Sequence, residues 1–191
     1  METRNRRTLF HGIVVELEQM EVRIGEKGWH LYQVVRHPGG VGVLPLHDDG
    51  TVTLIRQMRP AVNADLLEIP AGRLSPGEDP ALCGRRELSE ETGLAAETLS
   101  PLGTLHSSPG VFDEVIHLYL ATGLSQGTAE PEPYEEVETV RLPFEEAMRM
   151  AFDGKITDGK TLAALLRSAG RGRPTPFRTS PPGEGSSPET G

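Results

Sequence analysis

Short apolar runs separated by turn residues dominate the first half of the chain, which is the pattern of β-strands. Two runs rich in β-branched and aromatic residues, 13–24 and 29–37, flank the turn-like segment GEKG. Two more, 41–46 and 51–59, flank HDDG, which predicts a hairpin whose turn lies at Asp49-Gly50.

A helical period appears later in the chain, together with further strands. Asp79 is a suitable N-cap, Pro80 occupies the first helical position after it, and Gly93 is a suitable helix end. The segments expected to be helices are 78–93, 143–154 and 158–170, and further strands are expected at 66–72, 115–124 and 138–142. This order predicts a mixed sheet covered by a few helices.

Composition sets the last part of the 191-residue chain apart. From Ser168 onward the residues are mainly Gly, Pro and Ser, with Phe177 as the one aromatic. Such a segment buries too little apolar surface to offset the entropy of ordering it. We therefore expect residues 168–191 to be a disordered tail.

Charge and cysteine content narrow the class of protein. The formal net charge of -9 argues against a general nucleic-acid binder. It leaves room for a small phosphate ligand, because a few arginines or a metal ion supply positive charge locally. The single cysteine, Cys83, excludes an intramolecular disulfide framework and fits a reducing cytoplasm. No apolar run has the length of a membrane helix or a signal peptide, so we expect a cytoplasmic protein with no membrane partner.

Like charges are crowded on the first expected helix. Glu87, Glu90 and Glu91 share one helical face, with Cys83 one turn earlier. Each like-charge pair costs roughly 0.2–0.5 kcal/mol on an exposed helix, and anions in the last turn also meet the negative end of the helix dipole. Either this face is simply solvated, or a cation binds there. Carboxylates beside a glycine-containing loop suit Mg²⁺.

The spacing around these glutamates extends the pattern. Gly72 is followed by five residues, Glu78, seven residues and then RELSEETGL at 86–94. This series resembles the signature of the Nudix hydrolases at every specified position, and the wider resemblance covers residues 9 to about 167. It implies an α/β (α+β) fold: a Nudix-type α/β/α sandwich with a mixed central sheet. It also implies a division into N-terminal antiparallel strands at 1–40, used for dimerisation and the substrate pocket, and a Nudix hydrolase domain at 41–167.

The resemblance also implies the roles of the acidic residues. In the family this segment binds Mg²⁺ or Mn²⁺. The metal ligands implied are three glutamates and one main-chain carbonyl: Glu87, Glu90, Glu91 and Ala71. Glu78 and Arg86 have an orienting role, and the i,i+4 relation of Arg86 to Glu90 allows them to pair.

Residues outside the signature look like the ADP-ribose pyrophosphatase branch. These are LLEIPAG at 66–72, RQMRP at 56–60, DGKTLAALL at 158–166 and Pro109, sixteen residues beyond Gly93. The implied reaction is hydrolysis of ADP-ribose to AMP and ribose 5-phosphate. Relatives that act on GDP-mannose share several of these signs, so another nucleotide sugar is the alternative substrate. A ligand-sensing module without turnover is a further alternative, although such modules usually have a damaged signature.

Four residues are candidates for substrate binding. Arg56 and Arg59 could hold a pyrophosphate or ribose bidentately, but surface arginines are common. Pro109 begins a Pro-Gly turn that turn chemistry alone would explain. Trp29 could stack on adenine, or it could belong to the core or a dimer interface. His106 and His117 are expected to be structural.

The residue that takes a proton from the attacking water is sought in the acidic segment EPEPYEEVE. Glu136 is the first choice and Glu135 the second, while a solvated acidic loop would explain both. Glu90 could serve as the base instead. The branch forms homodimers that exchange N-terminal strands, so we expect a homodimer that binds a nucleoside diphosphate sugar.

Overall fold

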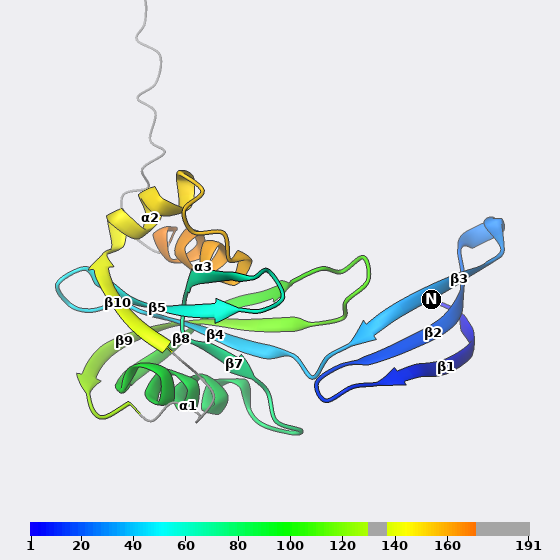
Figure 1. Cartoon of the computed structure of the whole chain (residues 1–191), viewed down its shortest axis with the longest axis horizontal. Coiled ribbons are helices and arrows are strands. Elements are labelled where there is room, and N and C mark those ends of the chain that lie inside the picture. Colours follow the sequence, from blue (N-terminus) through cyan, green and yellow to red (C-terminus); the bar gives the residue numbers. More distant parts are fainter. Residues whose placement is uncertain (130–136, 171–191) are drawn as a thin grey trace, which may run out of the picture.

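The computed structural model describes residues 1–129 and 137–170. Within these ranges ten strands form three sheets, with three α-helices and one short 3-10 helix. Helix α1 covers one side of the sheets, and α2 and α3 cover the other (Figure 1). The expected α/β/α layering is confirmed. No helix in the described ranges combines the length and apolarity needed to cross a bilayer.

The elements follow one another along the chain in this order. The strands are β1 (Thr3–His11), β2 (Glu16–Arg23), β3 (Trp29–Arg36), β4 (Gly40–Pro45), β5 (Thr51–Arg59), β6 (Ala64–Glu68), β7 (Ala71–Arg73), β8 (Leu94–His106), β9 (Val115–Gln126) and β10 (Val137–Pro143). The helices are η1 (Gly25–Lys27), α1 (Pro80–Thr92), α2 (Phe144–Phe152) and α3 (Gly159–Ala169).

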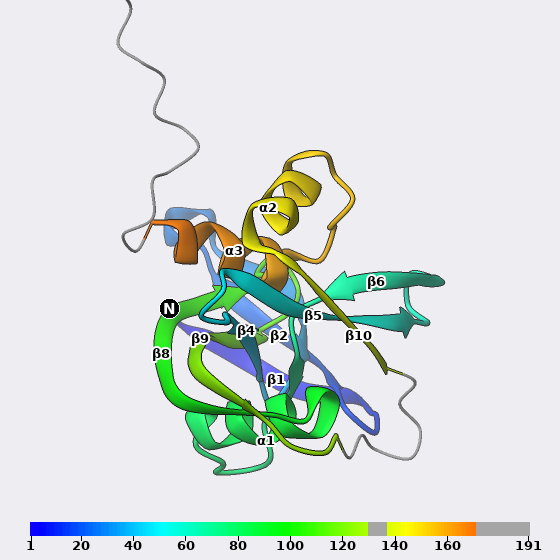
Figure 2. The same cartoon turned by 90° about the vertical axis from the view of Figure 1, so that its left-hand side faces the viewer.

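The central sheet is mixed, as the sequence predicts. Its strand order is β7-β4-β9-β8, with β4 parallel to β9 and the other pairs antiparallel. A second, antiparallel sheet has the order β10-β5-β6 (Figure 2). One apolar core, including Leu54, Ile69 and Leu165, fills the space beneath α2 and α3. A smaller one beneath α1 includes Val43 and Leu88.

The hairpin predicted across HDDG is wrong in its pairing. Strands β4 and β5 flank the turn, but they belong to different sheets and share only the isolated bridge Leu46–Val52. Both edges of β4 are occupied by β7 and β9, so β5 pairs with β6 and β10 instead. Pro45 also lacks the N–H that would continue the ladder.

Two strands, the division of a third and the start of the tail also differ from the prediction. Strand β1 was not predicted. All nine of its residues are exposed, so it lacks the alternation of buried and exposed positions that marks a strand. Strand β8 was missed because a register shift between Pro101 and Gly103 interrupts its alternation. The strand expected at 66–72 is divided into β6 and β7 around Pro70. Helix α3 ends at Ala169, within the range expected to be helical, so the first two residues of the expected tail, Ser168 and Ala169, belong to the domain, and both are buried. Residues 171–191 lie outside the described ranges.

Strands β1, β2 and β3 form a third sheet that extends away from the rest of the molecule (Figure 1). We call this sheet the N-terminal arm. Its backbone meets the body at the loop between β8 and β9, where the Val35 N–H donates to the Val111 carbonyl at 2.8 Å and the Asp113 N–H donates to the Val35 carbonyl at 3.1 Å. The arm is thereby attached to a loop that also borders the pocket described below.

Candidate active site

Local sequence signals determine where α1 begins and ends. The Asp79 carboxylate accepts hydrogen bonds from the N–H groups of Ala81 at 2.8 Å and Leu82 at 3.1 Å, which is N-capping. Gly93 adopts a left-handed conformation with φ of 71°, and its N–H donates to the Ser89 carbonyl. The predicted helix boundaries are confirmed, and they fix the rotational phase of the acidic face.

That face is turned inward. Glu91 and Glu87 are only 3% and 9% exposed, and Glu90 is half-buried. One Glu91 carboxylate oxygen accepts the Ala71 N–H at 2.9 Å, which ties α1 to β7. A Cβ on residue 72 would overlap the Glu87 carboxylate, so any larger residue there would displace the end of that side chain. Glu87 and Glu91 therefore do not belong to a solvated surface.

Arg86 balances the carboxylates at this site. Its guanidinium lies 2.7 Å from Glu87 and 3.0 Å from Glu90, and it donates two hydrogen bonds to Glu78 at 3.2 and 3.3 Å. These contacts, with Glu78 the largest, raise the pKa of Arg86. Hydrogen bonds from Arg86 and from the Ser75 N–H lower the pKa of Glu78 to about 2. The neighbouring Cys83 thiol is buried, which raises its pKa to about 12.

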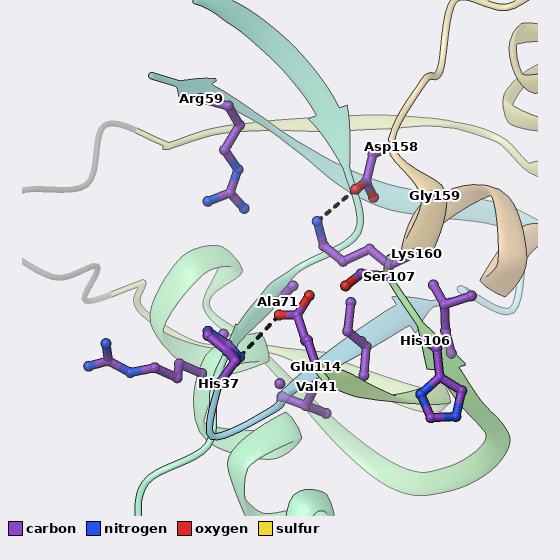
Figure 3. Close-up of a pocket in the computed structure, with 15 residues that line it drawn as sticks. His37, Val41, Arg59, Ala71, His106, Ser107, Glu114, Asp158, Gly159 and Lys160 are labelled. Carbon is purple, nitrogen blue, oxygen red and sulfur yellow. Dashed lines mark hydrogen bonds and ion pairs between the residues drawn. The ribbon is translucent and has the colours of Figure 1, made fainter. Parts of the chain in front are cut away.

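A pocket of about 440 Å³ lies beside β7 (Figure 3). A second hollow, of about 480 Å³, shares five of its lining residues and continues to Arg86 and Glu87 on α1. The shared residues are His37, Arg59, Ala71, Gly72 and Arg73. The two hollows thus adjoin along these residues, and their linings together extend from Glu87 on α1 to Lys160 on α3.

One wall of the pocket carries paired cations. Arg59, at the end of β5, donates two hydrogen bonds of 2.8 Å to Glu68. Lys160, at the start of α3, contacts the same carboxylate and lies 3.0 Å from Asp158. Figure 3 shows Arg59 and Lys160 approaching the pocket from different elements. Burial alone would raise the pKa of Glu68, but Arg59 and Lys160 outweigh it and the pKa is lowered.

The loop before β9 forms another side. Glu114 lines the pocket and lies 3.3 Å from His37 (Figure 3). Asp113 accepts the His37 N–H and a hydrogen bond from Arg36, each at 2.9 Å. Arg36 also donates to Glu18 of β2 at 2.6 Å. These ion pairs join the N-terminal arm to the edge of the pocket.

The structure brings some of the predicted substrate residues together and separates others. Arg59 and Ala71 line the pocket. Arg56 points elsewhere and lies 3.4 Å from Glu138, and Trp29 is on the arm with Arg4 stacked over its ring at 4.1 Å. Pro109 is exposed and does not line the pocket, although the ends of its loop do. The proposed bases Glu135 and Glu136 lie outside the described ranges.

Sequence reasoning did not name four residues that line the pocket as site residues: Arg73, Glu114, Asp158 and Lys160. It also did not name Glu68, which lies behind the lining and contacts Arg59 and Lys160. His106, expected to be structural, lines the pocket. A charged residue inside the apolar run LLEIP was the available signal for Glu68.

The donor set of α1 suits a hard divalent cation. Carboxylate and carbonyl oxygens are the ligands that Mg²⁺ prefers, and it commonly takes one or two carboxylates together with water and substrate phosphates. Glu87, Glu91 and the Ala71 backbone meet that need. In the described part of the chain no group of three acidic, His or Cys side chains is arranged to hold a metal ion. Glu87 and Glu90 both contact Arg86.

Comparison with known proteins identifies the class. The family model described as the NUDIX domain matches residues 36–165, so this chain belongs to the Nudix hydrolases, and it is similar to relatives named ADP-ribose pyrophosphatase. The family is typically dependent on divalent metals.

Particular relatives carry different names. The chain is 36% identical over 159 residues to the methanol dehydrogenase activator of Bacillus methanolicus, covering 82% of this chain and 86% of that one. It is 34% identical over 159 residues to the ADP-ribose pyrophosphatase of Bacillus subtilis, with the same coverage. A GDP-mannose pyrophosphatase of Escherichia coli is 33% identical over 165 residues, covering 81% and 84%. A solved structure of an ADP compounds hydrolase matches with a TM-score of 0.76 at 23% identity, covering 87% of this chain and 91% of that one, and it supports the fold.

Proposed function

We propose that this Nudix hydrolase cleaves the pyrophosphate bond of ADP-ribose, giving AMP and ribose 5-phosphate. The observation that carries the proposal is the pair of adjoining hollows whose linings include the buried carboxylate Glu87 on α1 and, on the opposite side, the wall with Arg59 and Lys160. A diphosphate lying in that space would place its phosphorus atoms near the acidic helix. Relatives named ADP-ribose pyrophosphatase support the choice of substrate.

The acidic face of α1 would hold Mg²⁺, with Mn²⁺ as the other candidate. The expected ligands are three carboxylates and a backbone carbonyl: Glu87, Glu90, Glu91 and Ala71. The cation would neutralise charge that develops on the phosphate oxygens and would acidify the attacking water. Since Glu87 and Glu90 contact Arg86, the guanidinium would compete with the ion for these carboxylates. Arg86 also donates to Glu78 and would orient the helix and its preceding loop.

A carboxylate must also accept the proton of the attacking water. Glu136 and then Glu135 remain the proposed bases; both precede β10 in the sequence and lie outside the described ranges. Glu90, half-buried next to Arg86, is the alternative. Single substitutions of Glu135 and Glu136 to Gln test the first two: loss of about tenfold or more in kcat in one of them supports it as the base, and unchanged kcat in both would leave Glu90 as the candidate.

Arg59 is the strongest substrate-binding candidate, because its guanidinium lines the pocket and keeps donors free of Glu68. Arg56 is weaker, since it faces Glu138 away from the pocket. Pro109 would act by shaping the loop whose ends, Ser107 and Glu114, line the pocket. Trp29 would stack on the adenine of the substrate only if that substrate were bound in a neighbouring subunit.

We also propose a homodimer formed through the N-terminal arm. The arm exposes several large apolar side chains: Leu9, Phe10, Ile13, Val14, Leu31 and Tyr32. Exposed apolar patches of this kind mark protein interfaces. Light scattering should give twice the monomer mass for the full chain, and removal of residues 1–14 should give a monomer. A monomeric full chain would overturn the proposal.

A panel of substrates with Mg²⁺ tests the function. Turnover should be fastest with ADP-ribose, giving AMP and ribose 5-phosphate, and should stop when the metal is chelated. GDP-mannose is the alternative substrate that a relative's name favours, and faster turnover of it would replace ADP-ribose. Absence of turnover on ADP-ribose, GDP-mannose, NADH and dinucleoside polyphosphates would favour a ligand-sensing module instead.

A further inference from the structure

The cationic wall of the pocket contains a buried carboxylate that the proposed reaction does not use. Glu68 ends β6 and is only 1% exposed. A buried carboxylate is costly unless it is paired, and Glu68 is paired twice, with Arg59 and with Lys160. Glu68 does not line the pocket, whereas both of its partners do.

The contact between Glu68 and Arg59 fixes the plane of the guanidinium as well as its distance from the carboxylate. Both Glu68 oxygens accept hydrogen bonds, one from Nε and one from Nη2, each at 2.8 Å. Such a bidentate pair sets the orientation of the planar guanidinium. Two of the five N–H donors of Arg59 are used in this way, so three remain for a ligand. The Arg59 side chain is 37% exposed and can present those donors to the pocket.

The charges on this wall cancel. Arg59 and Lys160 contribute two positive charges, and Glu68 and Asp158 contribute two negative ones. An anion therefore gains little from the net charge of the wall. What it gains depends on where the remaining donors of Arg59 point, and Glu68 determines that direction.

The residues after Glu68 extend this fixation to α1. The Ile69 N–H donates to the Thr161 hydroxyl at 2.8 Å, and the Thr161 hydroxyl donates to Asp158 at 2.5 Å. Two residues further, the Ala71 N–H donates to Glu91 at 2.9 Å. The segment 68–71 thus links the cationic wall to the acidic helix at a fixed separation.

We propose that Glu68 is a positioning residue, whose carboxylate orients Arg59 so that the arginine's free donors bind the diphosphate of the substrate. The class of ligand rests on the proposed function. The proposal has a consequence opposite in sign to that of simple electrostatics. Glu68→Gln removes one negative charge beside Arg59, and this change alone would strengthen anion binding. Loss of the bidentate pair should instead weaken anion binding.

The test is calorimetric titration of the full chain with inorganic pyrophosphate in the presence of Mg²⁺. Pyrophosphate is common to all the candidate substrates, so the result does not depend on the nucleoside. Glu68→Gln should raise Kd by about fivefold or more. In the double variant, Glu68→Gln should change Kd by less than about twofold relative to Arg59→Gln alone, because Glu68 acts through that arginine. Glu145→Gln makes the same charge change on the exposed surface of α2 and should leave Kd unaltered.

Three results would overturn the proposal: unchanged or tighter binding in Glu68→Gln, effects of the two substitutions that multiply, or no binding of pyrophosphate by the wild type. Thermal unfolding establishes that each variant is folded. Where Glu68→Gln does not fold, Arg59→Lys replaces it, since lysine keeps the charge and loses the planar fork. About fivefold weaker binding by Arg59→Lys supports the proposal, and equal binding contradicts it.

Steady-state kinetics separate this inference from the proposed function. With ADP-ribose, Glu68→Gln should raise KM by about fivefold while kcat stays within about threefold of the wild type. A purely structural role would lower the active fraction and leave KM unchanged. If the wild type does not hydrolyse ADP-ribose but the pyrophosphate titrations behave as expected, the substrate assignment fails and the role of Glu68 stands.

Discussion

Arg86 makes the acidic face of α1 possible. Its guanidinium contacts three carboxylates, Glu78, Glu87 and Glu90. Like charges so close together would otherwise repel each other with little solvent to screen them. Arg86, a residue of the same helix, thus neutralises part of the charge of this cluster. The carboxylates therefore have a stable arrangement before any cation binds.

Gly72 is the residue whose size matters most at this site. A methyl group there would overlap the Glu87 carboxylate, so Gly72→Ala must displace that side chain or β7. We expect kcat with ADP-ribose to fall by about tenfold or more, and the free energy of unfolding to fall by about 1–3 kcal/mol. Gly110→Ala is the matched control, since a Cβ at that position meets open space. Equal activity of the two variants would show that the close contact has no role.

Glu68 should also give stability a defined dependence on pH. Its pKa in the folded protein is lowered by Arg59 and Lys160 against the effect of burial. The stabilisation is therefore fully present above the unfolded pKa of about 4.3 and is lost as pH falls through the lower folded pKa. Near neutral pH, Glu68→Gln should unfold more easily than wild type by on the order of 3 kcal/mol.

The measurement is denaturant unfolding of both proteins at several pH values. The difference between them should be constant above about pH 5 and should shrink below about pH 4. Glu145→Gln should follow the wild type throughout. A difference that does not change with pH would mean that folding leaves the pKa of Glu68 unaltered, which contradicts the effect of its pairing with Arg59 and Lys160.

Among the elements, α1 shows what sequence alone can predict. Its N-cap, its end and its acidic face all depend on residues within the helix or beside it, such as Asp79 and Gly93. Those signals are local, so the helix was predicted closely. The pairing of β4 and β5 was not, because it depends on β7 and β9 occupying both edges of β4. The residues of the turn do not show which of several distant strands pairs with β4.

The pocket shows the same limit. Glu68 contacts Lys160 and Arg59, and Glu114 contacts His37, yet these residues come from separate parts of the chain. Chemistry of single residues suggested Arg59, whereas the cancelling charges around it become visible only in the fold.

The N-cap of α1 gives a test at the scale of the element. Asp79→Ala removes the acceptor for the Ala81 and Leu82 N–H groups. We expect the free energy of unfolding to fall by about 1 kcal/mol, measured by denaturant titration. Asp153→Ala, at the exposed C-terminal end of α2, removes an anion from the negative end of a helix and should be neutral or slightly stabilising. Equal losses in the two variants would contradict the capping role.

At the scale of the whole molecule, the arm and the body meet through charge. Arg36 of β3 bridges Glu18 of the arm and Asp113 of the loop beside the pocket. These ion pairs raise the pKa of Arg36, with Asp113 the largest cause. A second subunit bound to the arm would therefore act on a segment that is directly attached to the pocket edge.

The central claim is that the carboxylates on the acidic face of α1 act in hydrolysis of a substrate bound in the pocket beside β7. The most direct test is the Mg²⁺-dependent rate of ADP-ribose hydrolysis by Glu91→Gln. Glutamine keeps an acceptor for the Ala71 N–H and removes the charge, so the fold should survive. We predict a fall in kcat of about 100-fold or more with little change in Tm, whereas a folded variant with wild-type kcat would contradict the account.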